Sequence, residues 1–132
     1  MPTNINIILM KKQLSILLMA AIFLATQCKK AEEDSTPPTI DILSPEAGSN
    51  WTQADSVRIE AAIADEDLHK YSVKILKNDD DIFEFETHTH DQNVLYKKSW
   101  FSEETGQFLL RIEAEDHNGN SSSKQINFFV VN

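Results

Sequence analysis

Apolar and polar residues alternate along most of the sequence that follows Pro37. Apolar side chains at every second position are typical of strands that turn one face to a core and the other to water. In the segment 56–65, for example, Val57, Ile59 and Ile63 share one face with Ala61. The same period predicts seven short strands, in the segments 39–43, 56–65, 71–75, 82–90, 93–101, 107–116 and 124–131.

In one of these segments the pattern does not decide which face points to the core. In residues 93–101, Val94, Tyr96 and Trp100 share a face with Lys98, whereas the opposite face carries Leu95 and Phe101.

Turn-forming stretches separate the predicted strands, and no window after residue 37 has the period of an amphipathic helix. The pair Asn118-Gly119 tolerates the positive φ angles of a tight turn. The carboxylate of Asp116 can accept backbone N–H groups across that turn. Seven strands within about 95 residues predict an all-β chain, an immunoglobulin-like antiparallel sandwich over residues 38–132.

The first 27 residues have a different composition. Lys11 and Lys12 precede an uninterrupted apolar stretch of 12 residues, Leu14 to Ala25. A bilayer-spanning helix needs about 20 apolar residues, so this stretch is too short to span comfortably. It has the length of a signal-peptide core, with a short buried helix as the alternative interpretation. Residues 1–27 are therefore predicted to be a signal peptide.

The chain has one cysteine, Cys28, which directly follows this segment. A single cysteine cannot form an internal disulfide, and a free exposed thiol is reactive. The sequence LATQC resembles the lipobox of bacterial lipoproteins, in which small residues lead into an acylated cysteine that becomes the mature N-terminus. Ala25 and Thr26 are small, whereas Gln27 departs from that pattern. The resemblance implies that Cys28 is lipidated and anchored in a membrane; the alternative is a free periplasmic thiol.

Residues 28–37 are charged and contain proline, which is typical of a solvated linker. Their order of charges resembles the acidic export signal of surface lipoproteins in Bacteroidota, and this implies the outer face of the outer membrane. The alternative is a plain spacer on a lipoprotein of the periplasmic face. The residues of the predicted signal are Lys29, Lys30, Glu32, Glu33 and Asp34.

A second resemblance covers about residues 37–132. The stretches PPTIDILSPEAGSNW, SVRIEAAIADEDLHKYSVKIL and LLRIEAEDHNGNSSS are similar to bacterial immunoglobulin-like domains of Bacteroidota lipoproteins. The ending pattern A-x-D-x-x-G-N occupies residues 114–120. The resemblance implies an immunoglobulin-like fold in a family of unassigned function, and it implies no catalytic residues.

Charge and motifs exclude two classes of function. All 21 acidic residues but only 10 of the 12 basic residues lie after residue 27, a net charge of −11. Nucleic-acid binding depends on Lys and Arg that neutralise phosphates, so a nucleic-acid partner is excluded. The sequence has no G-x-S-x-G, P-loop or H-E-x-x-H motif, and we expect no enzymatic activity.

Metal binding is the sharpest alternative to plain display. His88 and His90 are two residues apart, so in a strand they point to the same side and could hold Zn²⁺ or Cu²⁺ with a carboxylate. The competing interpretation is the solvent face of an edge strand, where polar groups discourage aggregation. The acidic stretches 65–67 and 79–81 offer oxygen ligands for Ca²⁺, but a sandwich places these two loops at opposite ends. Solvated turns are the favoured interpretation there, and no cofactor is predicted.

These observations predict a lipoprotein anchored in the outer membrane through Cys28, with one non-catalytic immunoglobulin-like domain. Its expected partner is another envelope protein or an extracellular ligand. The first alternative is a metal-binding envelope lipoprotein that uses His88 and His90. A structural accessory of an envelope complex is the other.

Overall fold

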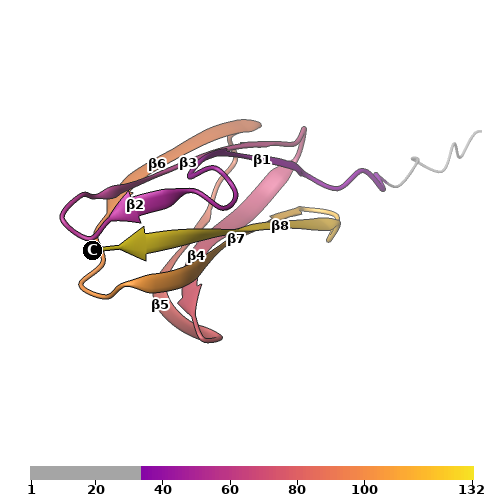
Figure 1. The fold of residues 1–132 in the computed structure, drawn as a ribbon. Helices are drawn as coiled ribbons and strands as arrows, with labels where there is room; N and C mark the ends of the chain where they lie inside the picture. The colour runs from indigo at the N-terminus through magenta and orange to yellow at the C-terminus, as the bar shows by residue number, and fades with distance from the viewer. Residues whose placement is uncertain (1–33) are drawn as a thin grey trace, which may run out of the picture. The chain divides into compact units, whose positions relative to one another are not determined.

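The computed structural model describes residues 34–132. This part of the chain is a compact unit of eight strands with no helix, so nothing in it could cross a membrane as a helix. The predicted signal peptide, Cys28 and the linker as far as Glu33 lie outside the described residues. The strands are β1 (Thr39–Ser44), β2 (Asn50–Thr52), β3 (Val57–Ala64), β4 (Leu68–Lys77), β5 (Asp80–His88), β6 (Asn93–Trp100), β7 (Gly106–Asp116) and β8 (Ser121–Val131) (Figure 1).

The strands form two sheets that face each other (Figure 1). One sheet has the order β1-β3-β6, and the other has the order β2-β8-β7-β4-β5. Every pair of neighbours is antiparallel except β2 and β8, which are parallel. The predicted all-β sandwich is confirmed, and its strand order is that of an immunoglobulin-like fold.

The strand count is eight instead of the predicted seven. The additional strand, β2, comprises three residues that pair with Phe129 to Val131. Backbone hydrogen bonds on both sides of it, from Gly48 to Asn127 and from Gln53 to Val131, fix it against β8. Three residues are too few to show a period of two, so the alternation of the sequence could not reveal this strand.

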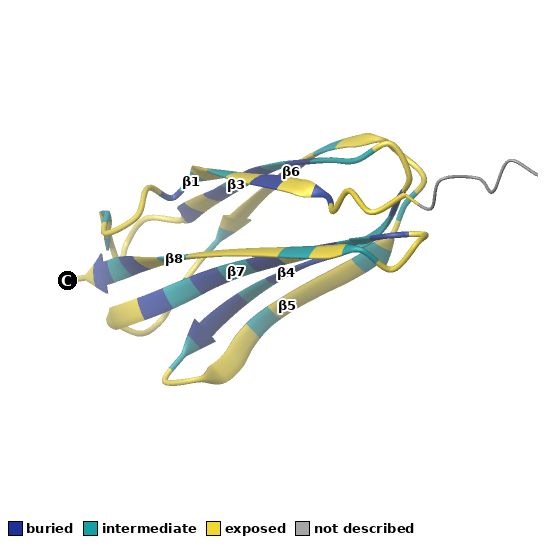
Figure 2. Ribbon diagram, turned by 90° about the vertical axis from the view of Figure 1, so that its right-hand side faces the viewer, coloured by how far each residue is buried: buried dark blue, intermediate teal, exposed yellow. Residues whose placement is uncertain are grey.

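The core lies between the sheets and consists of the alternating apolar residues (Figure 2). The structure shows which face of β6 points to the core, a question that the sequence pattern of residues 93–101 did not decide. Tyr96 is buried, and Trp100 packs edge-on against Phe108 at 5.3 Å between ring centroids. The opposite face of β6 and its end are in solvent, since Leu95 and Phe101 are each 56% exposed.

The loops divide between the two ends of the sandwich. At one end, Asn78 and Asp79 have φ angles of 54° and 69°, as expected for the tight turn that joins β4 to β5. The other end gathers residues 65–69, 88–92 and 116–120, and we call it the histidine end. Backbone hydrogen bonds link these segments, from Asp65 to Gln92 and from His117 to Asp67. The N-terminal residue of the unit, Asp34, also lies here, because its carbonyl accepts a hydrogen bond from the amide of Asn120 at 2.9 Å.

Candidate functional site

All four histidines of the chain meet at the histidine end. His69 is the second residue of β4, His88 is the last residue of β5, and His90 and His117 lie in the loops that follow β5 and β7. The ring centroid of His69 is 4.7 Å from that of His88 and 4.3 Å from that of His117. The rings of His90 and His117 stack at 5.4 Å with an angle of 13°. The rings thus form a continuous row in the order 88, 69, 117, 90.

A β-bulge gives His69 its place in this row. In the pairing of β4 with β7, Leu68 lies opposite Asp116 and Lys70 lies opposite Glu115, so His69 is the extra residue. A bulge bends the strand and redirects the side chain of the inserted residue. On the other side of β4, Lys70 pairs with His88, which brings the end of β5 next to His69.

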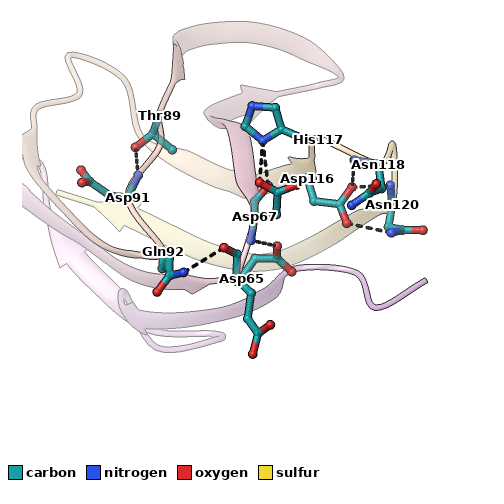
Figure 3. A network of polar contacts seen from close by, with 10 residues as sticks. Asp65, Asp67, Thr89, Asp91, Gln92, Asp116, His117, Asn118 and Asn120 are labelled. Carbon is teal, nitrogen blue, oxygen red and sulfur yellow. Dashed lines mark hydrogen bonds and ion pairs between the residues drawn. The ribbon is translucent and has the colours of Figure 1, made fainter. Parts of the chain in front are cut away.

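Asp116 holds the turn that carries His117. Its side chain is only 1% exposed, and one carboxylate oxygen accepts the backbone N–H groups of Asn118 and Asn120, both at 2.8 Å. The other oxygen accepts the side-chain amide of Asn120 at 2.7 Å (Figure 3). Burial opposes ionisation, but the hydrogen bonds from Asn120, Asn118 and Gly119 outweigh it and lower the pKa of Asp116. The predicted role of Asp116 as an acceptor across this turn is confirmed.

His117 is oriented by Asp67. Its Nδ1 lies 3.0 Å from the backbone carbonyl oxygen of Asp67 and 3.2 Å from a carboxylate oxygen of the same residue (Figure 3). Both partners are acceptors, so Nδ1 is the nitrogen that carries the hydrogen. In the neutral ring, Nε2 then keeps a free lone pair.

His69 is the least accessible member of the cluster. Its Nδ1 is buried and has no hydrogen-bond partner among the residues that the structure describes. Burial lowers the pKa of His69, and the neighbouring His117, His88 and Lys70 lower it further, with Glu115 opposing. The neutral form of His69 is therefore favoured.

The predicted metal ligands His88 and His90 are near each other in sequence, but their rings pack against two different histidines. His88 lies against His69, and His90 against His117. The sequence offers His117 as a third candidate ligand, but it places neither His117 nor His69 beside this pair, because their proximity depends on strand pairing far along the chain. As the side chains stand, no three His, Cys, Asp or Glu residues within 34–132 are arranged to hold a metal ion.

The acidic stretches lie at opposite ends of the sandwich; residues 65–67 are in a turn, whereas Asp80 and Asp81 belong to β5 instead of the expected loop. Asp65 accepts the backbone N–H of Asp67 at 2.8 Å, and Asp81 forms an ion pair with Lys74 at 3.3 Å. Asp34 is the one residue of the predicted export signal within the described part, and its carboxylate accepts the N–H of Thr36 at 2.9 Å.

A polar hollow of about 410 Å³ lies beside the cluster on the five-stranded sheet. Its walls include an ion pair between Lys70 and Glu115 at 3.2 Å. The remaining lining residues are Tyr71, Ser72, Glu86, Glu113, Ala114 and Ser121 to Ser123. None of them is a histidine or cysteine.

No family model matches this sequence, and no curated protein is similar enough to count as a relative. Solved structures do share the fold. An engineered protein, Northeast Structural Genomics Consortium target OR128, has a TM-score of 0.57 and 11% identity over 75% of this chain. The endo-β-1,4-mannanase of Thermotoga petrophila has a TM-score of 0.54 and 19% identity over 77% of this chain. The match spans 21% of each of those longer chains, and at such identities it shows the fold alone.

Proposed function

We propose that this protein is a lipid-anchored, non-catalytic module of the bacterial outer membrane, which displays its sandwich to another envelope protein or to an extracellular ligand. The observation that supports this most directly is the position of Asp34. The residue that begins the compact unit comes six positions after the lipobox-like Cys28 and is fixed to Asn120 at one end of the sandwich.

Under this proposal, the histidine end is the end of the domain near the membrane. Six residues reach at most about 20 Å, so acylation of Cys28 would keep the histidine end within about that distance of the lipid. Strand β7 has 11 residues and runs the length of the sandwich, about 35 Å at the usual rise per residue. The opposite end, with the β4–β5 turn and the exposed Phe101, would then point away from the membrane and meet partners.

The fold is suited to display. The core is closed between the two sheets and holds the apolar residues of nearly every strand. In the two similar solved structures the matching unit makes up about a fifth of a longer chain, which fits a module that works as part of a larger assembly. Along its exposed strands β5 and β6 the domain carries charged residues such as Glu84, Glu86, Lys97 and Lys98, which oppose edge-to-edge aggregation.

Mass spectrometry of the membrane fraction tests the anchor. In a Bacteroidota host, the full chain should yield an N-terminal peptide that begins with acylated Cys28, and Cys28→Ser should abolish both the acyl group and membrane retention. Because Gln27 departs from the usual small residue, Gln27→Gly should increase the processed fraction. A wild-type protein that is recovered soluble with a free Cys28 thiol would overturn the proposal.

Protease treatment of intact cells tests the leaflet. A surface-exposed domain should be degraded, and replacing Glu32, Glu33 and Asp34 by Ala should protect it by retaining it inside. In the matched control, Glu103 and Glu104 at the other end of the domain are replaced by Ala. This control should leave export unchanged. Protection of the wild-type domain would place the lipoprotein at the periplasmic face.

A further inference from the structure

The four imidazoles form one continuous row of ring contacts. The row begins at His88 and finishes at His90, and these residues are two positions apart. Consecutive Cα atoms are 3.8 Å apart, so the Cα atoms of His88 and His90 lie within about 7.6 Å of each other. The backbone positions that carry the two ends of the row are therefore close together.

The spacing of neighbouring rings in the row is similar to that of two imidazoles bound to the same ion. A zinc-bound nitrogen lies about 2.0–2.1 Å from the metal, so neighbouring ring centroids around one tetrahedral ion are roughly 5 Å apart. The centroid separations here are 4.3, 4.7 and 5.4 Å.

One ring has the hydrogen bonding of a metal ligand, and a second has a buried nitrogen without a partner. Metal-bound histidines usually donate their second ring N–H to a carbonyl or carboxylate, which fixes the tautomer. His117 has this arrangement, because its Nδ1 meets both the carbonyl and the carboxylate of Asp67 and leaves Nε2 free. His69 contributes a buried Nδ1 without a partner, an atom whose loss of hydrogen bonding a metal ion would compensate.

From this geometry we propose that the four histidines of the histidine end bind one transition-metal ion of the Zn²⁺ and Cu²⁺ class. Imidazole nitrogens suit these ions, whereas Ca²⁺ and Mg²⁺ prefer oxygen ligands. The carboxylate of Asp67 is the supporting group of the site. The proposal concerns the folded domain alone and does not depend on the membrane anchor.

Binding requires small rotations of exposed side chains. No three of the potential ligands converge on one point as the side chains stand. However, His88, His90 and His117 are exposed, and exposed side chains change rotamer within picoseconds to nanoseconds. The backbone positions are already set by the bulge at His69 and by the hydrogen bond from Thr89 to the carbonyl of His69, at 2.8 Å.

Calorimetric titration of residues 34–132, whose core is complete within this segment, tests the proposal. ZnCl₂ and CuCl₂ should each bind with one ion per chain, and MgCl₂ and CaCl₂ should give no signal. Removing a supporting hydrogen-bond partner typically weakens a metal site 10- to 100-fold, and Asp67→Ala should fall in that range. His117→Gln and His69→Gln should each weaken binding at least as much.

Controls separate this site from a simple pair of surface histidines. Asn118→Ala changes an exposed neighbour of His117 and should leave the affinity unaltered. Long-range ¹H–¹⁵N spectra with Zn²⁺ should shift ring nitrogens of all four histidines, which a merely structural role would not produce. Because His117 is exposed, its variant should fold even if the His69 variant does not. The proposal is overturned by wild-type affinity in His117→Gln, by shifts confined to His88 and His90, or by no binding at 100 µM of either ion.

Discussion

Replacing Tyr96 by phenylalanine should stabilise the domain. Within residues 34–132, two side-chain atoms are buried without a hydrogen-bond partner, the Nδ1 of His69 and the hydroxyl oxygen of Tyr96. Tyr96 is 8% exposed, and its ring packs against Phe85 at 5.3 Å and Tyr71 at 6.4 Å. Phenylalanine keeps both ring contacts and removes only the unpaired hydroxyl.

The expected gain follows from two opposing terms. A buried hydroxyl without a partner costs about 1–3 kcal/mol of folding free energy. The void that the missing oxygen leaves is roughly 10 Å³, which costs about 0.2 kcal/mol at 24 cal/mol per Å³. Tyr96→Phe should therefore raise the free energy of unfolding by about 1 kcal/mol or more. For a domain of this size each kcal/mol raises the melting temperature by about 4–8 °C.

Urea unfolding followed by the fluorescence of Trp51 and Trp100 would measure this change, with calorimetry for the melting temperature. Tyr71→Phe is the matched control, because Tyr71 is equally buried at 8% exposure but its hydroxyl is not among the unpaired atoms. It should be neutral or destabilising. If Tyr96→Phe lowers the urea midpoint, the hydroxyl has a partner in solution and the reasoning fails.

Three further predictions concern stability. Burial, followed by the neighbouring Tyr71, raises the pKa of Tyr96 from 10.0 to about 12. The unfolded chain therefore loses this proton first, so the folding free energy is unaffected below pH 10 and becomes less favourable as the pH rises from 10 towards 12. Tyr96→Phe should reduce the fall in urea midpoint between pH 9 and pH 11.5. Phe128 is fully buried and stacks on Phe108 at 5.6 Å, so Phe128→Ala should cost about 3–5 kcal/mol, whereas the exposed Phe101→Ala should stay within about 0.5 kcal/mol in the same assay. Asp116→Ala leaves three donors without their acceptor and should lower the melting temperature clearly more than the exposed Asp80→Ala; equal melting temperatures would contradict a structural role for this carboxylate.

The core could be predicted from the sequence because the alternation within each strand identifies the side chains that face inward. Alternation placed Val57, Ile59 and Ile63 in the core, and all three are at most 1% exposed. The same rule could not assign β2, which is too short to show a period. The rule also began one strand too late. It predicted a strand over residues 71–75, whereas β4 begins at Leu68, a buried residue within the polar stretch DEDLHK.

The histidine cluster could not be predicted because it depends on register. The sequence showed that His88 and His90 are neighbours, but nothing local indicates that His69 stands in a bulge or that His117 lies across from Asp67. Both facts require the pairing of β4 with β7, residues more than 40 positions apart. Knowledge of the strand order would have sufficed to place the loops at one end, but the bulge that redirects His69 is visible only in the structure.

The two proposed activities, metal binding and partner binding, would take place at opposite ends of the sandwich. Asp34 and the histidines share one end of the sandwich, whereas Phe101 and the β4–β5 turn lie at the other. If Cys28 is anchored as proposed, a metal ion at the histidine end would neutralise acidic groups such as Asp67 on the side nearest the lipid, without touching a partner on the distal loops. Variants of His117 should therefore alter metal affinity and leave partner capture unchanged, and variants of Phe101 should do the reverse. If both kinds of variant affected both properties, the two ends would have to be coupled through the sheets, and the display geometry argued from Asp34 would be wrong.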